Sequence, residues 1–357
     1  MPQRARPDMS DPVKTDGFAF VEFVAENPRG LVELFQNLGF RLRGKAQGDI
    51  YLMTQGAAAF IVNGMPNRFR ETHGTSVRAI GIRVNDAARA QSQAFAGGAE
   101  VALASKDGAF VVDAPAILGI GDSLVYFVDF DFRQVFNVSA EAWNIADGGA
   151  SIVAVDHTSN IVHPENLDRW ANFYRDTFGF AEKQYLEVKG HMSGMRARSM
   201  VSPCGRVSIP VAAAAHDKPG VLNQNDEFIR DYGGEGIQHI ALLTSDIENT
   251  IDKLSQAGIE FMHAPSQTYY AGIATRLPNH GLDIERLAGR GILVDGKGPK
   301  RVLLQRFTKR QIGPVFFEII ERRGEDGFGE GNFKALFESQ ENDQQERGLN
   351  ASENTRI

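Results

Sequence analysis

The sequence predicts an α+β fold of two similar halves, each built from paired modules of one strand, one helix and three strands that curl into an open barrel, followed by one C-terminal helix. Two observations predict this class: an internal repeat, and short apolar or alternating strands that return about every 8 to 20 residues. The chain has 357 residues, of which 42% are hydrophobic and 23% charged, a composition that supports one or two well-packed domains.

The repeat is clearest in two segments that align without a gap. HGTSVRAIGIRVNDAARAQSQAFAGGAEV starts at His73, and GGEGIQHIALLTSDIENTIDKLSQAGIEF starts at Gly233. Both predict a strand, a polar break, an amphipathic helix and a glycine-ended exit into another strand. Such strands, with only one helix in each module, are typical of a mostly antiparallel sheet with helices on its outer face.

A second pair of matching segments precedes these two. FAFVEFVAENPRGLVELFQNLGFR starts at Phe18 and VAVDHTSNIVHPENLDRWANFYRDTFGFA at Val153, and each predicts a strand, a helix and a Gly-Phe pair that ends the helix. We therefore expect an N-terminal domain over residues 1–148 and a C-terminal domain over residues 149–357, with a linker near residues 146–149.

The charge and the cysteine content exclude several classes of function. A net charge of −7 with no basic stripe argues against nucleic acid as a partner. No apolar run approaches the roughly 20 residues that a membrane span needs, and the first ten residues resemble a loose leader without the apolar segment of a secretion signal. The single cysteine, Cys204, cannot form an internal disulfide, so we expect a cytoplasmic protein.

Two of the eight histidines differ from the rest. The other six lie in or beside polar or turn-like segments, where solvated side chains are expected: His73, His163, His191, His216, His263 and His280. His157 and His239 each interrupt an otherwise apolar strand, and the repeat places them in corresponding strands of adjacent modules. Glu318 interrupts the apolar segment GPVFFEIIER, where an unpaired buried carboxylate would be strongly unfavourable. These three side chains are the predicted metal ligands.

The first half offers an internal control for this prediction. At the matching positions it carries Glu22, Ala79 and, by a looser alignment, Val128, so it keeps the fold and lacks the ligand set. Taken singly, each histidine of the second half could be a hydrogen-bonded core residue, and Glu318 a charge on an edge strand. Their joint appearance on matching strands of only one half favours the metal site.

The ligand types indicate which metal to expect. Two imidazoles and one carboxylate leave about three positions open on an octahedral ion, an arrangement typical of non-haem iron(II) that binds a bidentate substrate and O2. A zinc hydrolase could share the ligands but would need a nearby general base, and the sequence has no helical HExxH motif. Iron(II) is therefore the expected cofactor.

Several segments carry a specific family resemblance. DHTSNIV, WANFYRDTFGF, GEGIQHIALLTSDI and GPVFFEIIERRGEDGFGEGNFKALFES are similar to the matching segments of the 4-hydroxyphenylpyruvate dioxygenase family, and the resemblance extends over nearly the whole chain. It implies two vicinal-oxygen-chelate halves, iron in the second half, and a reaction that turns 4-hydroxyphenylpyruvate and O2 into homogentisate and CO2, as in tyrosine catabolism. The glycines of GFGEGNFKALFES predict a loop that swings the following helix, about residues 332–347, over the pocket.

The resemblance also assigns pocket residues. Gln224 and Gln238 would face the phenol end of the substrate, and Gln305 would form a hydrogen bond close to the iron. Three phenylalanines would enclose the ring, although on sequence alone they are equally compatible with ordinary core: Phe307, Phe328 and Phe333. The related 4-hydroxymandelate synthase tends to carry an aliphatic residue at the last of these positions, so Phe333 favours ring hydroxylation.

Two positions depart from the family pattern. Where the family usually has a serine and an asparagine that help to hold the glutamines and the phenol, this chain has Ala197 and Ala212. A buried polar group that loses its partner costs about 1–3 kcal/mol, so binding of a phenolic substrate could be weakened. We expect either an altered, phenylpyruvate-like 2-oxo acid, or compensation by Ser199 and Ser208 from neighbouring positions.

Two other classes of function remain open. One is a different enzyme on the same scaffold, such as a 4-hydroxymandelate-forming or extradiol ring-cleaving dioxygenase, or a zinc or nickel isomerase, which metal analysis and O2 uptake would distinguish. The other is a protein that sequesters a metal or a small molecule without turnover. The sheet of the first half, free of metal ligands, is expected to serve subunit contacts in a homo-oligomer, either a dimer or a tetramer.

Overall fold

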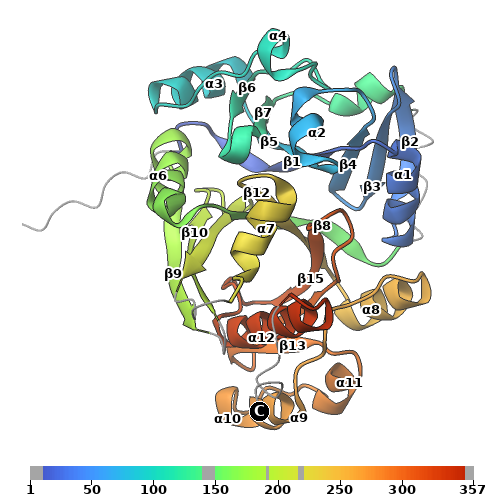
Figure 1. Cartoon of the computed structure of the whole chain (residues 1–357), viewed down its shortest axis with the longest axis vertical. Coiled ribbons are helices and arrows are strands. Elements are labelled where there is room, and N and C mark those ends of the chain that lie inside the picture. Colours follow the sequence, from blue (N-terminus) through green and yellow to red (C-terminus); the bar gives the residue numbers. More distant parts are fainter. Residues whose placement is uncertain (1–10, 139–148, 190–192, 216–220, 350–357) are drawn as a thin grey trace, which may run out of the picture.

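The computed structural model describes residues 11–138, 149–189, 193–215 and 221–349. The first ten residues, most of the expected linker near residues 146–149, and His191 and His216 lie outside these ranges. The two halves of the chain lie one above the other in Figure 1, each around its own sheet.

Within its described residues the first half forms a seven-stranded sheet in the order β2-β3-β4-β1-β5-β7-β6. The strands are β1 (Thr15–Val24), β2 (Arg41–Ala46), β3 (Ile50–Gln55), β4 (Ala58–Asn63), β5 (Ser76–Val84), β6 (Ala116–Leu118) and β7 (Leu124–Val128). The helices are α1 (Pro28–Asn37), α2 (Arg68–His73), α3 (Ala87–Ala96) and α4 (Ala104–Asp107).

Over its described part the second half forms an eight-stranded sheet in the order β13-β14-β15-β12-β8-β11-β10-β9. The strands are β8 (Ile152–Ile161), β9 (Ala181–Lys189), β10 (Gly194–Val201), β11 (Ser208–Ala215), β12 (Gly236–Thr244), β13 (Leu293–Gly298), β14 (Arg301–Phe307) and β15 (Phe316–Arg323). The helices are α6 (Leu167–Phe178), α7 (Gln224–Tyr232), α8 (Ile247–Gln256), α9 (Gln267–Ala271), α10 (Ile273–Arg276), α11 (Ile284–Gly289) and α12 (Glu330–Glu346).

The strand pairing confirms the predicted α+β class and its paired modules. In each module the first and last strands pair in parallel: β1 with β4, β5 with β7, β8 with β11, and β12 with β15. The first strands of the two modules in a half pair antiparallel, β1 with β5 and β8 with β12. The remaining pairs are antiparallel as well, so each sheet is mostly antiparallel, as expected.

The predicted helix ends follow from glycine conformation. Gly39 after α1 and Gly179 after α6 adopt φ of 88° and 71°, a left-handed conformation that a residue with a side chain rarely adopts. Each is followed by a phenylalanine that packs into the core, Phe40 or Phe180. The Gly-Phe pair therefore stops the helix and turns the chain into the next strand, as the sequence predicts.

Two expectations about the modules are wrong. The strands predicted directly after α3 and α8 are reduced to the isolated bridges Val101 to Ile117 and Phe261 to Thr308. In the last module three short helices, α9 to α11, stand between α8 and β13, where one helix per module was expected. Pro265 lacks a backbone N–H for a strand ladder, and Ser266 caps α9 by accepting a hydrogen bond from the backbone N–H of Tyr269, so the chain turns into helix at this point.

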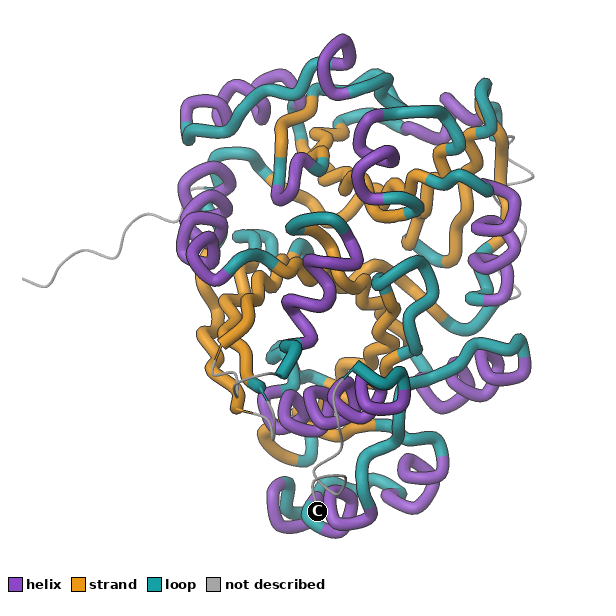
Figure 2. Tube along the Cα trace, in the orientation of Figure 1, coloured by secondary structure: helices purple, strands orange, loops and turns teal. Residues whose placement is uncertain are grey.

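The second sheet curls into an incomplete ring, which Figure 2 shows with α6 and α8 at its outside and α7 across its middle in this view. Helix α12 contacts β9 and β13, the two edge strands, and so spans the opening of the ring. Helix α7 packs against β8, β11 and β12 and contacts α12. None of the helices in the described ranges combines the length and the apolar character needed to cross a membrane.

The two halves share an apolar core. Phe317 of β15 packs against an aromatic cluster of the first half, with ring centroids 6.5, 6.2 and 6.0 Å from those of Phe23, Phe35 and Phe60. Because side chains alternate along a strand, the next residue, Glu318, faces the opposite way, into the ring of the second half. A contact between the halves thus fixes the strand that carries the predicted carboxylate ligand.

Helix α7 also joins the halves. The hydroxyl of Tyr232, its last residue, donates a hydrogen bond of 3.0 Å to the backbone carbonyl of Val77 in β5. Nδ1 of His73 lies 2.8 Å from the carbonyl oxygen of Tyr232, and the two rings are 4.7 Å apart. The C-terminal end of α7 is therefore fixed on the first half, while its N-terminal end reaches the interior of the second.

Candidate metal centre

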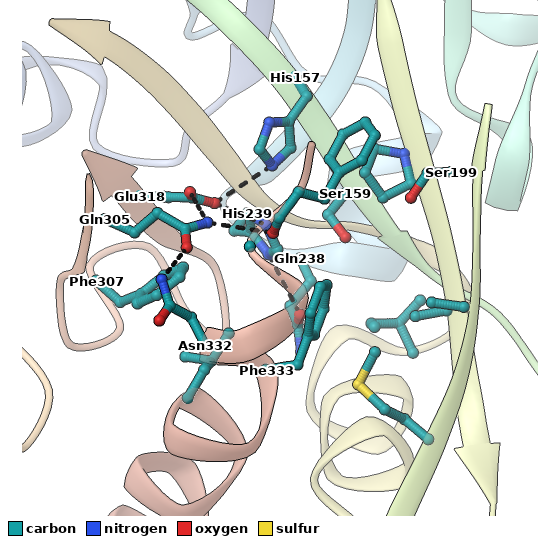
Figure 3. A pocket seen from close by; sticks show the side chains of 18 of the residues that line it. His157, Ser159, Ser199, Gln238, His239, Gln305, Phe307, Glu318, Asn332 and Phe333 are labelled. Atoms are coloured by element: carbon teal, nitrogen blue, oxygen red, sulfur yellow. Dashed lines mark hydrogen bonds and ion pairs between the residues drawn. The ribbon is translucent and has the colours of Figure 1, made fainter. Parts of the chain in front are cut away.

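Three neighbouring strands bring His157, His239 and Glu318 together inside the second half. Ala241 of β12 pairs with His157 of β8 on one side and with Glu318 of β15 on the other. His239 lies two residues before Ala241 and so faces the same side of the sheet. Oε2 of Glu318 lies 3.3 Å from Nε2 of His157 and 3.6 Å from Nε2 of His239 (Figure 3).

The chemistry of this cluster fits a divalent cation. One nitrogen or oxygen atom from each side chain lies within 4.8 Å of the others, and the exposed fractions are only 3% for His157, 9% for His239 and 2% for Glu318. Among the described residues that line the surrounding cavity there is no lysine or arginine to neutralise the carboxylate. Imidazole nitrogens and a carboxylate oxygen are donors that iron, zinc and related ions accept in proteins.

The surroundings shift the pKa values of the two imidazoles in opposite directions. Burial favours the neutral form of His157, but the Glu318 carboxylate and the hydrogen bond to Asp156 raise its pKa to about 9. Burial, together with the charge on His157, lowers the pKa of His239 well below its usual range. In the protein without a cation, the pair of His157 and Glu318 therefore retains a proton that a metal ion would displace.

An aspartate orients His157. Oδ1 of Asp156 lies 2.8 Å from Nδ1 of His157, which leaves Nε2 directed at Glu318. Arg322 donates to both carboxylate oxygens of Asp156, at 2.7 and 2.8 Å, and its other nitrogen donates to the carbonyl of Gly327 at 2.6 Å. Burial would raise the pKa of Asp156, but Arg322 and His157 hold it well below its usual range. This chain of contacts links a predicted ligand to the loop before α12.

A second chain of hydrogen bonds holds Glu318 from the other side. Nε2 of Gln305 donates to Oε1 of Glu318 at 2.9 Å, and Nδ2 of Asn332 donates to Oε1 of Gln305 at 2.8 Å (Figure 3). The hydroxyl of Tyr269 donates to Oδ1 of Asn332 at 2.6 Å. At Gly329 a Cβ would lie 2.2 Å from Oε1 of Gln305, so glycine allows the loop to approach this close.

The cluster lies in a cavity with about 680 Å³ of space, including its open mouth. Besides the three predicted ligands, its polar lining consists of Ser159, Ser199, Asn225, Gln238, Gln305, Asn332 and Gln340. Its apolar lining consists of Ile161, Met195, Ala197, Pro210, Ala212, Phe307, Phe328, Gly329, Phe333 and Leu336. Strands β8, β10, β11, β12, β14 and β15 and the start of α12 supply most of these residues.

The structure brings most of the predicted pocket residues together. Gln238, Gln305, both alanines and all three phenylalanines line this cavity. Gln224 lines a smaller neighbouring cavity, which shares Gln238 and Gln340 with the first. Ser199 lines the cavity, whereas Ser208 pairs with His157 in the sheet and is not part of the described lining.

Sequence reasoning missed several functional candidates. Asp156 and Arg322 carry a signal that was available, since each places a charge next to a predicted buried strand position. Asn332 belongs to the glycine-rich segment whose role was assigned only as a loop. Asn225 gives no such signal, because a polar residue in the first turn of a helix is ordinary.

Within its described residues the first half has no such ligand cluster, but two of the three residues matched to the predicted ligands were wrong. The repeat matches Ala241 to Gly81, which pairs with Phe20 in β1 and Tyr126 in β7. Phe20 and Tyr126 therefore occupy the positions of the first imidazole and of the carboxylate, in place of Glu22 and Val128, while Ala79 was matched correctly. The register of β1 on β5 is the same as that of β8 on β12, bulges included, so the mismatch came from aligning the first strands two residues out of step. The rings of Phe20 and Tyr126 are 5.6 Å apart and fill this space.

Helix α12 is held over the cavity by one buried carboxylate. Glu227 of α7, with no exposed side-chain surface, accepts hydrogen bonds from Gln344 at 2.7 Å and from Arg347, and Arg310 lies 2.8 Å from it. Burial would raise the pKa of Glu227, but Arg347, Arg310 and Gln344 lower it. The far end of α12 is thus tied to the helix that lies beside the cavity.

Paired modules and a buried cluster of two imidazoles and one carboxylate define the chain as a vicinal-oxygen-chelate protein of the glyoxalase and dioxygenase class. Residues 154–285 match the family model described as Glyoxalase/Bleomycin resistance protein/Dioxygenase superfamily. Residues 9–141 match the model described as Hydroxyphenylpyruvate dioxygenase, HPPD, N-terminal. The chain belongs to the 4-hydroxyphenylpyruvate dioxygenase family.

Curated relatives match over almost their full length. The chain is 42% identical to Hemolysin VllY of Vibrio vulnificus, over 96% of this chain and 98% of that protein. It is 39% identical to 4-hydroxyphenylpyruvate dioxygenase of Pseudomonas aeruginosa, over 97% of this chain and 99% of that protein.

Solved structures share the fold. A fusion of a xylose isomerase-like TIM barrel with 4-hydroxyphenylpyruvate dioxygenase matches 95% of this chain with a TM-score of 0.78 and 26% identity, and the chain spans 55% of that protein. A mutant of 4-hydroxymandelate synthase from Streptomyces coelicolor matches 92% of this chain and 99% of its own length, with a TM-score of 0.77 and 23% identity.

Proposed function

We propose that this chain is an iron(II)-dependent dioxygenase that converts 4-hydroxyphenylpyruvate and O2 into homogentisate and CO2, a step of tyrosine catabolism. His157, His239 and Glu318 would hold the iron. When bound there, iron(II) would supply open coordination positions for the 2-oxo acid and O2, and the redox chemistry that activates O2. No outside reductant is required, because the substrate supplies the electrons and both oxygen atoms of O2 enter the products.

The observation that carries this proposal is the charge of the cavity. A 2-oxo acid is an anion, and the described lining offers no arginine or lysine to receive its carboxylate. The cluster of His157, His239 and Glu318 is the place where a cation would be held in an otherwise neutral cavity. A substrate that chelates the cation through its carboxylate and keto oxygens satisfies this arrangement.

The chain's own residues would orient the substrate and exclude water. Asp156 and Gln305 fix His157 and Glu318 through hydrogen bonds, so the ligand atoms are aligned before a metal arrives. The rings of Phe307, Phe328 and Phe333 form an apolar wall beside the cluster and suit an aromatic side chain. Helix α12 covers the cavity and limits its contact with solvent.

The same lining disfavours a hydrolase or an extradiol enzyme. Both would need a free base to deprotonate water or a catechol. Within the described lining, the titratable side chains are His157, His239 and Glu318 alone, and all three are predicted ligands. This supports a reaction in which the substrate binds as an anion without losing a further proton.

The proposal is tested by loading the purified protein with iron(II) under anaerobic conditions, adding 4-hydroxyphenylpyruvate and O2, and recording O2 uptake with mass analysis of the product. Homogentisate and CO2 in equal amounts are expected. The matched variants are His239→Ala, which should abolish uptake, and His280→Ala, a half-buried histidine outside the cavity, which should not.

Other outcomes have distinct meanings. 4-Hydroxymandelate as the product would assign the sister activity and contradict the role given to Phe333. Turnover of other 2-oxo acids alone would keep the iron site and change the substrate. Binding without O2 uptake for any 2-oxo acid would leave a binding protein and refute the proposed reaction.

We further infer that residues 1–148 and 149–357 form two domains, that the protein acts as a homo-oligomer and that it works in the cytoplasm. The separate sheets and the confinement of the ligand cluster to the second half support the division. A single cysteine, Cys204, suits a reducing compartment. Light scattering of the purified protein would test the oligomer, and a monomer would contradict it.

A further inference from the structure

The strand register shows where the cavity ends. Ser208 of β11 pairs with His157, and Ala212, four residues further along β11, pairs with Ile161 at the end of β8. Four strand residues span roughly 13 Å, so this end lies about one aromatic 2-oxo acid away from the metal cluster. Ala197 of β10 pairs with Ala212 and lines the same wall. The wall made by β10 and β11 is therefore apolar at these two positions, near which the phenol of the substrate would arrive.

A polar group faces this end from a different element. Asn225, in the first turn of α7, lines the cavity and is only 3% exposed. Its side-chain Nδ2 has no hydrogen-bond partner within the part of the chain that the structure describes. Gln224, which precedes it, is also buried, and neither amide atom has a partner among the same residues. A buried N–H without an acceptor is unfavourable, so Asn225 is suited to a ligand that brings one.

The start of α7 is held firmly enough to aim this side chain. Asn223 caps the helix by accepting a hydrogen bond of 2.9 Å from the backbone N–H of Asn225. Nδ2 of Asn223 donates to the carbonyl of Gly194 in β10 at 2.7 Å, which fixes the helix start against the strand that carries Ala197. Asn225 therefore faces the apolar wall from a fixed position.

We propose that Asn225 is the specificity-determining residue for the distal hydroxyl of the substrate, donating through Nδ2 to the phenol oxygen of a 4-hydroxyphenyl 2-oxo acid. This inference rests on the proposed function and deepens it. The donor that the family places on the strands is absent at Ala197 and Ala212, and the helix supplies one in its place. The protein consequently keeps its preference for a hydroxylated ring, and the preference depends on α7.

The test measures binding without turnover. Protein loaded with iron(II) is titrated by calorimetry under anaerobic conditions with 4-hydroxyphenylpyruvate and, separately, with phenylpyruvate. Wild-type protein is expected to bind the hydroxylated acid at least about tenfold more tightly, and Asn225→Leu, similar in shape, should reduce this ratio at least about fivefold while leaving phenylpyruvate within about twofold. Asn249→Leu, which changes a partly buried asparagine in the first turn of α8 outside the cavity, is the matched control.

Each outcome decides the inference. Equal affinity of wild-type protein for both acids overturns it, and so does an Asn225→Leu variant that keeps the preference or weakens both acids alike. If the leucine variant does not fold, Asn225→Ala can be used to measure the same ratio of affinities, because alanine is a good helix former. Selective binding without O2 uptake would refute the proposed reaction and leave the role of Asn225 intact, whereas a loaded protein that binds neither acid overturns both.

Discussion

Asp156 determines how the imidazole of His157 is presented to the metal cluster. A ligand histidine needs its second nitrogen held, because the hydrogen bond there fixes both the tautomer and the ring orientation. Here the carboxylate that does this is itself held by two hydrogen bonds from Arg322. The orientation of one predicted ligand thus depends on a residue outside the candidate cluster.

The variant Asp156→Asn is expected to weaken iron(II) binding about 10- to 100-fold, because a neutral amide oxygen holds the Nδ1–H of His157 less strongly than a carboxylate and leaves Arg322 without its anionic partner. Anaerobic titration with iron(II) measures this change. The matched control is Asp168→Asn, an exposed carboxylate that pairs with Arg198 away from the cavity. Equal metal affinity for the Asp156 variant and wild-type protein would contradict the role given to Asp156.

How far the sequence predicts the site depends on the kind of residue. His157, His239 and Glu318 were predictable because each puts a polar group into an apolar strand, where only a partner or a metal makes it favourable. The residues matched to them in β1 and β7 were each two residues out of step, because an apolar strand without the ligands offers no landmark for the alignment. Asn225 could not be predicted, because its importance comes from the burial of a helix start.

Helix α12 illustrates how an element is positioned by contacts at both ends. Near its start Asn332 bonds to Gln305, and at its end Arg347 and Gln344 reach Glu227 of α7. Its predicted range, about residues 332–347, is close to the observed Glu330–Glu346. Helices α9 to α11 escaped prediction because helices of four to six residues are too short to show a 3.6-residue period.

Arg347→Met is expected to loosen α12. Arg347 is one charged partner of Glu227, at the partly exposed end of the helix, and its removal should weaken the attachment of α12 by about 1 kcal/mol. Amide hydrogen exchange over α12 should accordingly become about fivefold faster. Hydrogen exchange followed by mass spectrometry reads this out, with β8 and β12 unchanged. Arg323→Met, which removes the partner of Glu321 on β15, should leave α12 unaffected. Unchanged exchange in the Arg347 variant would show that Glu227 does not secure the helix.

The charge on Glu227 also predicts a pH dependence. Its pKa is lowered in the folded protein from an ordinary value of 4.5, so the unfolded chain binds more protons near that pH. The stability it contributes is therefore complete above the unfolded pKa and is lost as the pH falls through the folded pKa. Urea unfolding should show that the free energy of unfolding falls more between pH 7 and pH 4 for wild-type protein than for Glu227→Gln. An equal fall in the free energy of unfolding of both proteins would show that Glu227 does not cause this pH dependence.

At the scale of the whole molecule, the described residues of a duplicated fold carry one candidate metal-ligand cluster instead of two. In the first half Phe20, Ala79 and Tyr126 stand at the matching positions, and none of them can bind a cation as an imidazole or carboxylate would. The buried ion pair of Glu22 and Arg78, 3.1 Å apart, instead occupies part of that interior. The fold class, the repeat and the single site were all predictable, because they depend on patterns that persist over many residues.

One iron(II) is therefore expected per chain, and its binding should stabilise the folded protein. At a free metal concentration a thousand times the dissociation constant, the gain is about 4 kcal/mol, which raises the melting temperature. Thermal unfolding with and without iron(II), in parallel with metal analysis, measures both quantities. His239→Ala should show no rise. Two equivalents of tightly bound iron per chain would refute the single site.

The attachment of Tyr232 to Val77 has a consequence for how this protein can evolve. Since α7 rests on the first half at one end and faces the far end of the cavity at the other, a substitution in β5 can tilt the helix and alter which acid is accepted. Natural selection for a new substrate can therefore act on buried residues outside the cavity. The first half, whose described residues hold no such ligand cluster, therefore remains under selection because the second half packs against it.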